Sequence, residues 1–135
     1  MNVFVDTSAL YALLDRDDQN HASAAAIWVD LIDRGASLVC TNDVLVEAFA
    51  LVQHRLGMDA VRTLENDVLA VVDVRWMAEA THQAGVAALL TAASRRLSLV
   101  DCVSFEAMRS LGIQTAFAFD RHFAEQGFTL LGGES

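Results

Sequence analysis

The sequence of 135 residues contains no lysine, no proline and only two cysteines. The absence of lysine excludes two classes of acidic α/β protein, response-regulator receiver domains and haloacid-dehalogenase phosphatases, because both use an essential lysine beside a phosphorylated aspartate. The phosphatases also need a second aspartate two residues after the first, where this chain has Ser8. Cys40 and Cys102 lie far apart and form no CxxC pair, which favours reduced, partly buried thiols over a disulfide or a zinc site.

Long apolar runs are also missing from the sequence. None approaches the roughly 18 residues that a membrane span needs, and no basic region of a signal peptide precedes the apolar start of the chain. The hydrophobic content of 54 % nevertheless predicts compact folding. We therefore expect a soluble cytoplasmic protein with no membrane contact and one domain, residues 1–135, of which 132–135 form a loose tail.

Positive charge is scarce as well. Nine arginines face 18 acidic residues, which gives a formal net charge of −9. A protein that held nucleic acid only by neutralising its phosphates would be basic, so this balance counts against a passive DNA or RNA binder. It leaves one route to phosphates, through metal ions held by clustered carboxylates.

The apolar pattern alternates between short continuous runs and helical spacing. The runs predict strands at about 3–5, 37–40, 70–74, 115–119 and 128–131, and the helical spacing predicts helices at about 8–14, 21–33, 42–56, 58–69, 76–94, 99–111 and 121–126. A helical crossover between the first two strands makes a right-handed βαβ unit with parallel strands the default arrangement. We expect a three-layer α/β/α domain with a mostly parallel sheet of four or five strands.

Two aspartates follow predicted strands directly. Asp6 comes after the buried run Val3 to Val5, and Asp120 ends the run TAFAF and precedes a short helix. The crevice at the carboxyl ends of parallel strands is where open α/β sheets bind ligands. An alternative for the first stretch is that Asp6 or Thr7 only caps the following helix, a role that both residue types fill well.

Two further acids lie on the inward sides of helices. Glu47 falls among the apolar residues of its helix, where a carboxylate must pair or bind a cation; Arg55 or Arg62 is an alternative partner. Asp101 follows Ser98 by three residues, which resembles a capping box, so helix capping alone could account for it.

These four positions can converge on one end of a parallel sheet. Four carboxylates within a few ångströms cannot all stay ionised without cations, because like charges raise each other's pKa. Hard oxygen ligands select Mg²⁺ or Mn²⁺ over zinc. The histidines show no paired ligand spacing that would indicate a zinc site; they are His21, His54, His82 and His122.

Four segments, each containing one of these acids, carry a resemblance to a known family: VFVDTSALYALLD, TNDVLVEAFAL, LSLVDCVSFEAMRSLGI and AFAFDRHFAEQGF. Together they resemble the PIN-domain ribonucleases, in particular the VapC-type toxins of bacterial toxin-antitoxin pairs, over essentially the whole chain. The resemblance implies a catalytic and metal-binding quartet supported by nearby hydroxyls: Asp6, Glu47, Asp101 and Asp120, with Thr7, Ser8 and Ser104. The chain departs from the pattern at Ala118, where many relatives carry a threonine.

The resemblance also implies an activity and partners. The activity is Mg²⁺- or Mn²⁺-dependent cleavage of a structured RNA, such as a tRNA or an rRNA loop, that arrests translation. The partners are a second copy of the chain and a small cognate antitoxin. Arg95, Arg96 and Arg121 lie near two of the acids in sequence, so we expect them to hold substrate phosphates. The alternatives are a flap-type DNA nuclease and a non-catalytic interaction module of the same fold.

Overall fold

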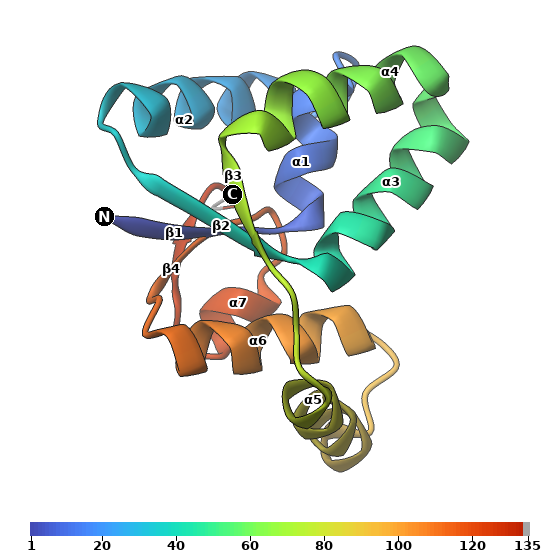
Figure 1. Ribbon diagram of the computed structural model, residues 1–135, viewed down its shortest axis with the longest axis vertical. Coiled ribbons are helices and arrows are strands. Elements are labelled where there is room, and N and C mark those ends of the chain that lie inside the picture. Colours follow the sequence, from blue (N-terminus) through green and yellow to red (C-terminus); the bar gives the residue numbers. More distant parts are fainter. Residues whose placement is uncertain (134–135) are drawn as a thin grey trace.

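Within residues 1–133, which the computed structural model describes, five parallel strands form one sheet in the order β3-β2-β1-β4-β5 (Figure 1). The strands are β1 (Asn2–Val5), β2 (Ser37–Thr41), β3 (Val72–Arg75), β4 (Thr115–Phe117) and β5 (Thr129–Leu131). Their common direction confirms the predicted parallel sheet. It also places all five carboxyl ends at the same edge.

Strand β1 occupies the centre of the sheet. Its residues Val3, Phe4 and Val5 are fully buried, as the unbroken apolar run predicts for a strand covered on both faces. Val3 pairs with Leu38 of β2 on one side and with Thr115 of β4 on the other. The first strand of the chain therefore joins two segments that are far apart in sequence.

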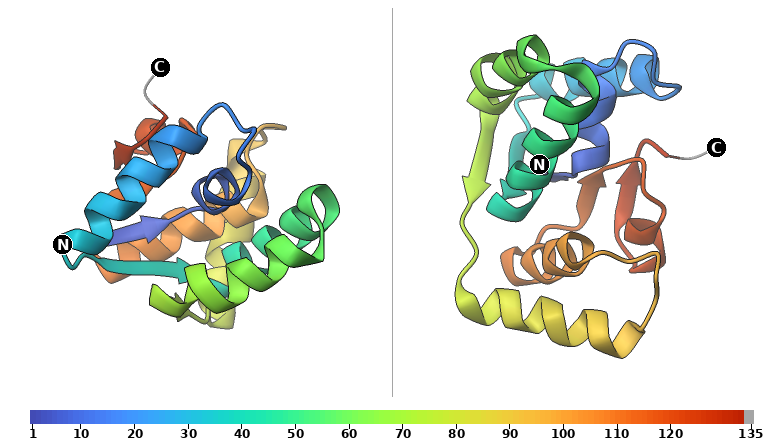
Figure 2. Two further views of the ribbon diagram at one scale, coloured as in Figure 1. Left: turned by 90° about the horizontal axis from the view of Figure 1, so that it is seen from above. Right: turned by 90° about the vertical axis from the view of Figure 1, so that its right-hand side faces the viewer.

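Helices cover both faces of the sheet and complete the predicted three layers. They are α1 (Thr7–Leu14), α2 (His21–Asp33), α3 (Asn42–Leu56), α4 (Met58–Thr63), α5 (Glu79–Ala92), α6 (Leu99–Leu111) and α7 (His122–Glu125). Figures 1 and 2 show α1 to α4 on one side and α5 to α7 on the other. None of the helices within residues 1–133 has the length and hydropathy that a membrane span requires.

Most predicted boundaries lie within one or two residues of the observed ones, and three elements illustrate the differences. The helix expected at 58–69 ends at Thr63 and continues as a π-helical turn and a 3₁₀ turn, so β3 starts only at Val72. Helix α5 starts at Glu79 rather than residue 76, and Trp76 is 73 % exposed. Strand β4 ends at Phe117, two residues before the end of its apolar run. An apolar pattern shows which residues are apolar but not which backbone hydrogen bonds end an element, so predicted ends can be displaced by a few residues.

Helices α5 and α6 pack closely because of one glycine. A Cβ added at Gly85 would lie 2.5 Å from Cγ2 of Val103 in α6. Real Cβ atoms do not approach so closely, so only glycine fits there without movement of the two helices. Of the predicted tail 132–135, Gly132 is buried beside Phe119, and residues 134–135 lie outside the described residues.

Candidate metal centre

A pocket of about 330 Å³ brings the four predicted acids together. We call it the acidic pocket; it is lined by Asp6, Thr7, Ser8, Glu47, Leu51, Ser98, Asp101 and Asp120. Its residues come from the segments that follow β1 and β4 and from helices α1, α3 and α6. Elements separated by more than 100 residues in sequence thus supply carboxylates to one cavity.

Asp6 is both a helix cap and a member of the acidic pocket. The backbone N–H and the hydroxyl of Ser8 donate to its Oδ2 at 3.1 and 2.6 Å, so Asp6 caps α1. The side chain is only 4 % exposed. Burial raises the pKa of Asp6 to about 7, with smaller contributions from Asp101 and Asp120, although the Ser8 hydrogen bonds act in the opposite direction. Near neutral pH this carboxyl is balanced between its two protonation states.

Asp101 combines the same two features. It forms a capping box with Ser98, in which Ser98 N–H donates to Asp101 Oδ2 at 3.1 Å and Asp101 N–H donates to Ser98 Oγ at 3.0 Å. Burial raises its pKa, and the charges of Asp120 and Glu47 add to the rise, against the Ser98 hydrogen bonds. Capping and charge clustering, which the sequence presents as alternatives, are both present in the structure.

Glu47 is half-buried on α3 and has no cationic partner among the described residues. Arg62 pairs instead with Asp59 at 2.9 Å, and the guanidinium of Arg55 lies 5.5 Å from the ring centre of Tyr11. The alternative in which one of these arginines neutralises Glu47 is therefore wrong. Its carboxylate faces the acidic pocket without a counter-charge.

Asp120 is accompanied by a histidine that the sequence analysis missed. The backbone N–H of His122 donates to Asp120 Oδ1 at 2.9 Å, and His122 Nδ1 lies 3.0 Å from the same oxygen and 4.0 Å from Asp101 Oδ2. Ligand atoms of these three residues all lie within 4.8 Å of one another. The sequence signal for this histidine is the Asp-x-His spacing in FDRHF, which a comparison of histidine pairs does not detect.

The donor set of the acidic pocket fits a divalent cation. It contains four carboxylates, two of them with a raised pKa, and it adjoins a buried His122 Nδ1 that lacks a hydrogen-bond partner among the described residues. A cation would favour ionisation of the carboxyls and provide a partner for the ring nitrogen. Oxygen-rich sites of this kind suit Mg²⁺ or Mn²⁺.

Comparison with known proteins agrees with this geometry. The model of the PIN-domain family matches residues 3–128. The chain belongs to the PIN-domain family. This PIN domain is 33 % identical over 127 residues, 93 % of this chain and 95 % of the relative, to the 23S rRNA-specific endonuclease VapC20 of Mycobacterium tuberculosis. The predicted family resemblance is therefore confirmed.

Solved structures show the same fold. The crystal structure of Mycobacterium tuberculosis VapC20, described as a sarcin-ricin loop cleaving toxin, matches with a TM-score of 0.84 at 31 % identity, over 94 % of this chain and 96 % of that one. VapBC2 from Rickettsia felis, bound to a promoter DNA fragment, matches with a TM-score of 0.71 at 10 % identity. This match covers 96 % of the present chain and 97 % of the other. FitAcB from Neisseria gonorrhoeae matches with a TM-score of 0.69 at 15 % identity, and the match covers 98 % of each chain. The last two likenesses show the fold alone.

The predicted supporting hydroxyls of this PIN domain have different surroundings. Ser8 Oγ donates to Asp6 and accepts the N–H of Phe119 at 2.9 Å, so it links α1 to the segment that carries Asp120. Thr7 Oγ1 donates to the carbonyl of Val44 at 3.4 Å. Ser104 is fully buried outside the lining of the acidic pocket, and its Oγ has no partner among the described residues.

The three predicted phosphate-binding arginines are exposed and do not line the acidic pocket. Arg95 and Arg96 lie in the connection between α5 and α6 that leads to Ser98. Arg121 stands between Asp120 and the start of α7. Their positions in the chain put them at the ends of segments that enter the pocket, and their role in this PIN domain stays a prediction.

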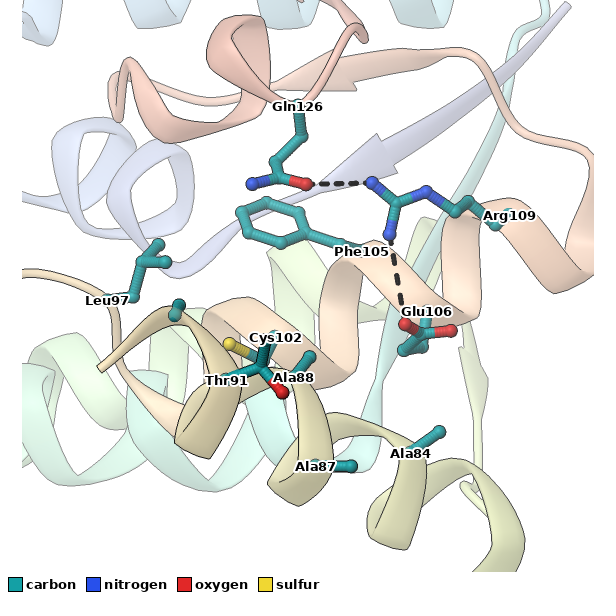
Figure 3. A pocket seen from close by; sticks show the side chains of 11 residues that line it. Ala84, Ala87, Ala88, Thr91, Leu97, Cys102, Phe105, Glu106, Arg109 and Gln126 are labelled. Carbon is teal, nitrogen blue, oxygen red and sulfur yellow. Dashed lines mark hydrogen bonds and ion pairs between the residues drawn. The ribbon is translucent and has the colours of Figure 1, made fainter. Parts of the chain in front are cut away.

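Two further hollows in this PIN domain differ in character from the acidic pocket. A groove of about 430 Å³ is lined by alanines of α5 and by Leu97 and Phe105 (Figure 3). In this groove the guanidinium of Arg109 donates a hydrogen bond to Gln126 Oε1 at 2.8 Å and forms an ion pair with Glu106 at 3.8 Å. It is the larger cavity, but none of the predicted site residues lines it. A smaller hollow of about 270 Å³ shares Glu47 with the acidic pocket and is otherwise lined by Asp43, Val46, His82, Leu99 and Val100.

Proposed function

We propose that this protein is a Mg²⁺- or Mn²⁺-dependent endoribonuclease toxin that cleaves a structured RNA and is neutralised by a cognate antitoxin. The observation that carries the proposal is the meeting of Asp6, Glu47, Asp101 and Asp120 in one pocket of a PIN domain. The 33 % identity to VapC20, named as a 23S rRNA-specific endonuclease, extends over nearly the whole of both chains and supports an RNA substrate.

The four carboxylates would hold the cation. A bound Mg²⁺ or Mn²⁺ supplies Lewis acidity toward water and toward the scissile phosphate. The chain keeps these carboxylates in place through short local hydrogen bonds, from Ser8 to Asp6, from Ser98 to Asp101 and from the His122 backbone to Asp120. Because three of the four carboxylates, Asp6, Asp101 and Asp120, are fixed by their own neighbours, the pocket is largely preorganised and little rearrangement is needed when the cation binds.

An rRNA loop is the substrate that the comparisons favour, and a tRNA is the alternative. VapC20 is described as cleaving the sarcin-ricin loop. With a net charge of −9, this chain needs local cations to approach RNA, and Arg95, Arg96 and Arg121 are exposed and close in sequence to the proposed ligands. We assign them to the RNA backbone beside the scissile phosphate, and we place the activity in the cytoplasm, where ribosomes are present.

Two protein partners complete the proposal. The acidic pocket would accept a basic side chain from an antitoxin, which would replace the cation as the counter-charge of the carboxylates. A homodimer would cover some of the large apolar side chains that the single chain leaves exposed, including Val46 at 68 %, Trp76 at 73 % and Leu90 at 73 %.

The test is cleavage of a short RNA with the sequence of the sarcin-ricin loop, followed by mapping of the new 5′ ends. Cleavage should require Mg²⁺ or Mn²⁺ and stop with EDTA, and Glu47→Gln should abolish it. Glu65→Gln, which neutralises an exposed glutamate outside the pocket, is the matched control and should cleave normally. Full activity in EDTA, or in Glu47→Gln, would refute the proposed chemistry. Cleavage of flap DNA in place of RNA would identify the DNA nuclease.

A further inference from the structure

His122 is positioned by the same turn that positions Asp120. It is the first residue of α7, and its backbone N–H donates to Asp120 Oδ1 at 2.9 Å. This short turn brings the imidazole next to the carboxylate, with Nδ1 at 3.0 Å from Asp120 Oδ1. The side chain keeps only 23 % of its surface exposed, so the ring is held largely within the protein.

The ring nitrogen Nδ1 is the unusual atom of this residue. It is buried, and no hydrogen-bond partner exists for it among residues 1–133. It lies 3.0 Å from Asp120 Oδ1 without the alignment of a hydrogen bond, and 4.0 Å from Asp101 Oδ2. A buried polar atom left without a partner is unfavourable, so an additional group at this position would stabilise the site.

Together with Asp101 and Asp120, His122 forms a three-residue donor set. One ligand atom from each lies within 4.8 Å of the other two, which is close enough for the three residues to hold one metal ion. We propose that His122 is a nitrogen ligand of the cation held at the Asp101 and Asp120 end of the acidic pocket, and that it makes the site prefer Mn²⁺ to Mg²⁺. The proposal rests on the proposed metal-dependent function and specifies the ligand set of that site.

The preference follows from the chemistry of the donors. Mg²⁺ is a small, hard cation that takes oxygen ligands and retains its waters. Mn²⁺ uses the same oxygen ligands, but it belongs to the first-row transition series, whose members also bind nitrogen donors. A carboxylate-only pocket would bind Mn²⁺ and Mg²⁺ with more similar affinities. A mixed set of two carboxylates and one imidazole adds a nitrogen ligand that Mn²⁺ accepts more readily than Mg²⁺.

The decisive measurement is made on the wild-type protein without RNA. Mn²⁺ is added to the full chain prepared with ¹⁴N-histidine or ¹⁵N-histidine, and pulsed electron paramagnetic resonance records nuclei coupled to the metal. A directly bound imidazole should give a nitrogen coupling that changes with the isotope. Bound Mn²⁺ without such a coupling would overturn the proposal and leave the carboxylate site and the ribonuclease function intact.

Variants distinguish a His122 that binds the metal directly from a His122 that only orients Asp120. His122→Gln should lower Mn²⁺ affinity by about tenfold or more, change Mg²⁺ affinity less than twofold, and remove the nitrogen coupling. His54→Gln, at an exposed histidine near the end of α3, is the control and should change neither. Equal weakening of both metals would assign His122 to orientation and refute the proposal. An absence of Mn²⁺ binding would refute this proposal, and an absence of both Mn²⁺ and Mg²⁺ binding would refute the metal-dependent function as well. A nitrogen coupling without RNA cleavage would refute only the function.

Discussion

The clearest consequence of the acidic pocket is that Asp6 should destabilise the metal-free protein at neutral pH. Its pKa in the folded state is about 7, against an ordinary value of 3.8. Each pKa unit corresponds to about 1.4 kcal/mol, so ionised Asp6 lowers the free energy of unfolding by about 4 kcal/mol at most. Asp6→Asn keeps an oxygen that accepts from Ser8 and removes the charge, and it should recover most of this amount.

The pH dependence has a definite sign. Between pH 3.8 and about 7 the folded state holds a proton on Asp6 that the unfolded state has lost. Stability therefore falls as pH rises through this window, and the full penalty applies above it. Below the lower limit both states are protonated and Asp6 makes no difference. Asp6→Asn should thus exceed the wild type in stability at about pH 8, and the two should converge at about pH 4.

Urea denaturation in EDTA, followed by circular dichroism at several pH values, measures this difference. Asp17→Asn, at an exposed aspartate in the turn after α1, is the control and should change stability by less than about 0.5 kcal/mol. If Asp6 were only a helix cap, Asp6→Asn would be neutral or less stable at every pH. A loss of about 0.5–2 kcal/mol at alkaline pH, the range measured for lost caps, would refute the reasoning.

Three further predictions concern metal, RNA and packing. Because a proton on Asp6 competes with the cation, Mg²⁺ affinity measured by calorimetry should rise with pH up to about 7 and then level off; a flat profile would contradict this. Alanine at Arg95, Arg96 and Arg121 should weaken RNA binding and reduce its dependence on salt concentration in filter-binding assays; unchanged binding for all three would place the RNA elsewhere. Gly85→Ala should destabilise the fold by about 1–3 kcal/mol in urea, because its Cβ would collide with a valine of α6; an unchanged midpoint would show that the helices separate freely.

The order of strands and helices was predictable because the local patterns were unambiguous. A continuous apolar run buried on both faces identifies β1, and regular helical spacing identifies α2, α3 and α6 with their observed ends. The convergence of the four acids was predictable from two patterns. Parallel strands must end at one edge, which brings Asp6 and Asp120 together, and the helical spacing puts Glu47 and Asp101 on inward sides of their helices. The boundaries of β3 and α5 could not be predicted, because an apolar pattern does not distinguish a π-helical turn from the α-helix before it, and because the apolar Trp76 is exposed rather than part of a helix.

The electrostatics of the site could not be obtained from the sequence. Asp101 and Asp6 each cap a helix and also face other carboxylates, and sequence reasoning could only treat these roles as alternatives. For His122 the sequence offered only the Asp-x-His spacing in FDRHF, which places it near Asp120 but does not reveal its distance of 4.0 Å to Asp101, a residue 21 positions earlier. The relation of the exposed arginines to bound RNA depends on a complex and is not contained in the isolated chain.

The hydrogen bond from Phe119 to Ser8 has a consequence for how the protein is made. It joins residues 111 positions apart, and β1 also pairs with β4 across a similar separation. A chain still being synthesised has β1 without its second neighbour and lacks Asp120 altogether until the last strands emerge. Such long-range pairing delays folding until distant segments are available. A translating ribosome therefore carries a growing chain whose acidic pocket is incomplete, and the chain gains all four of its carboxylates only when its synthesis is almost finished.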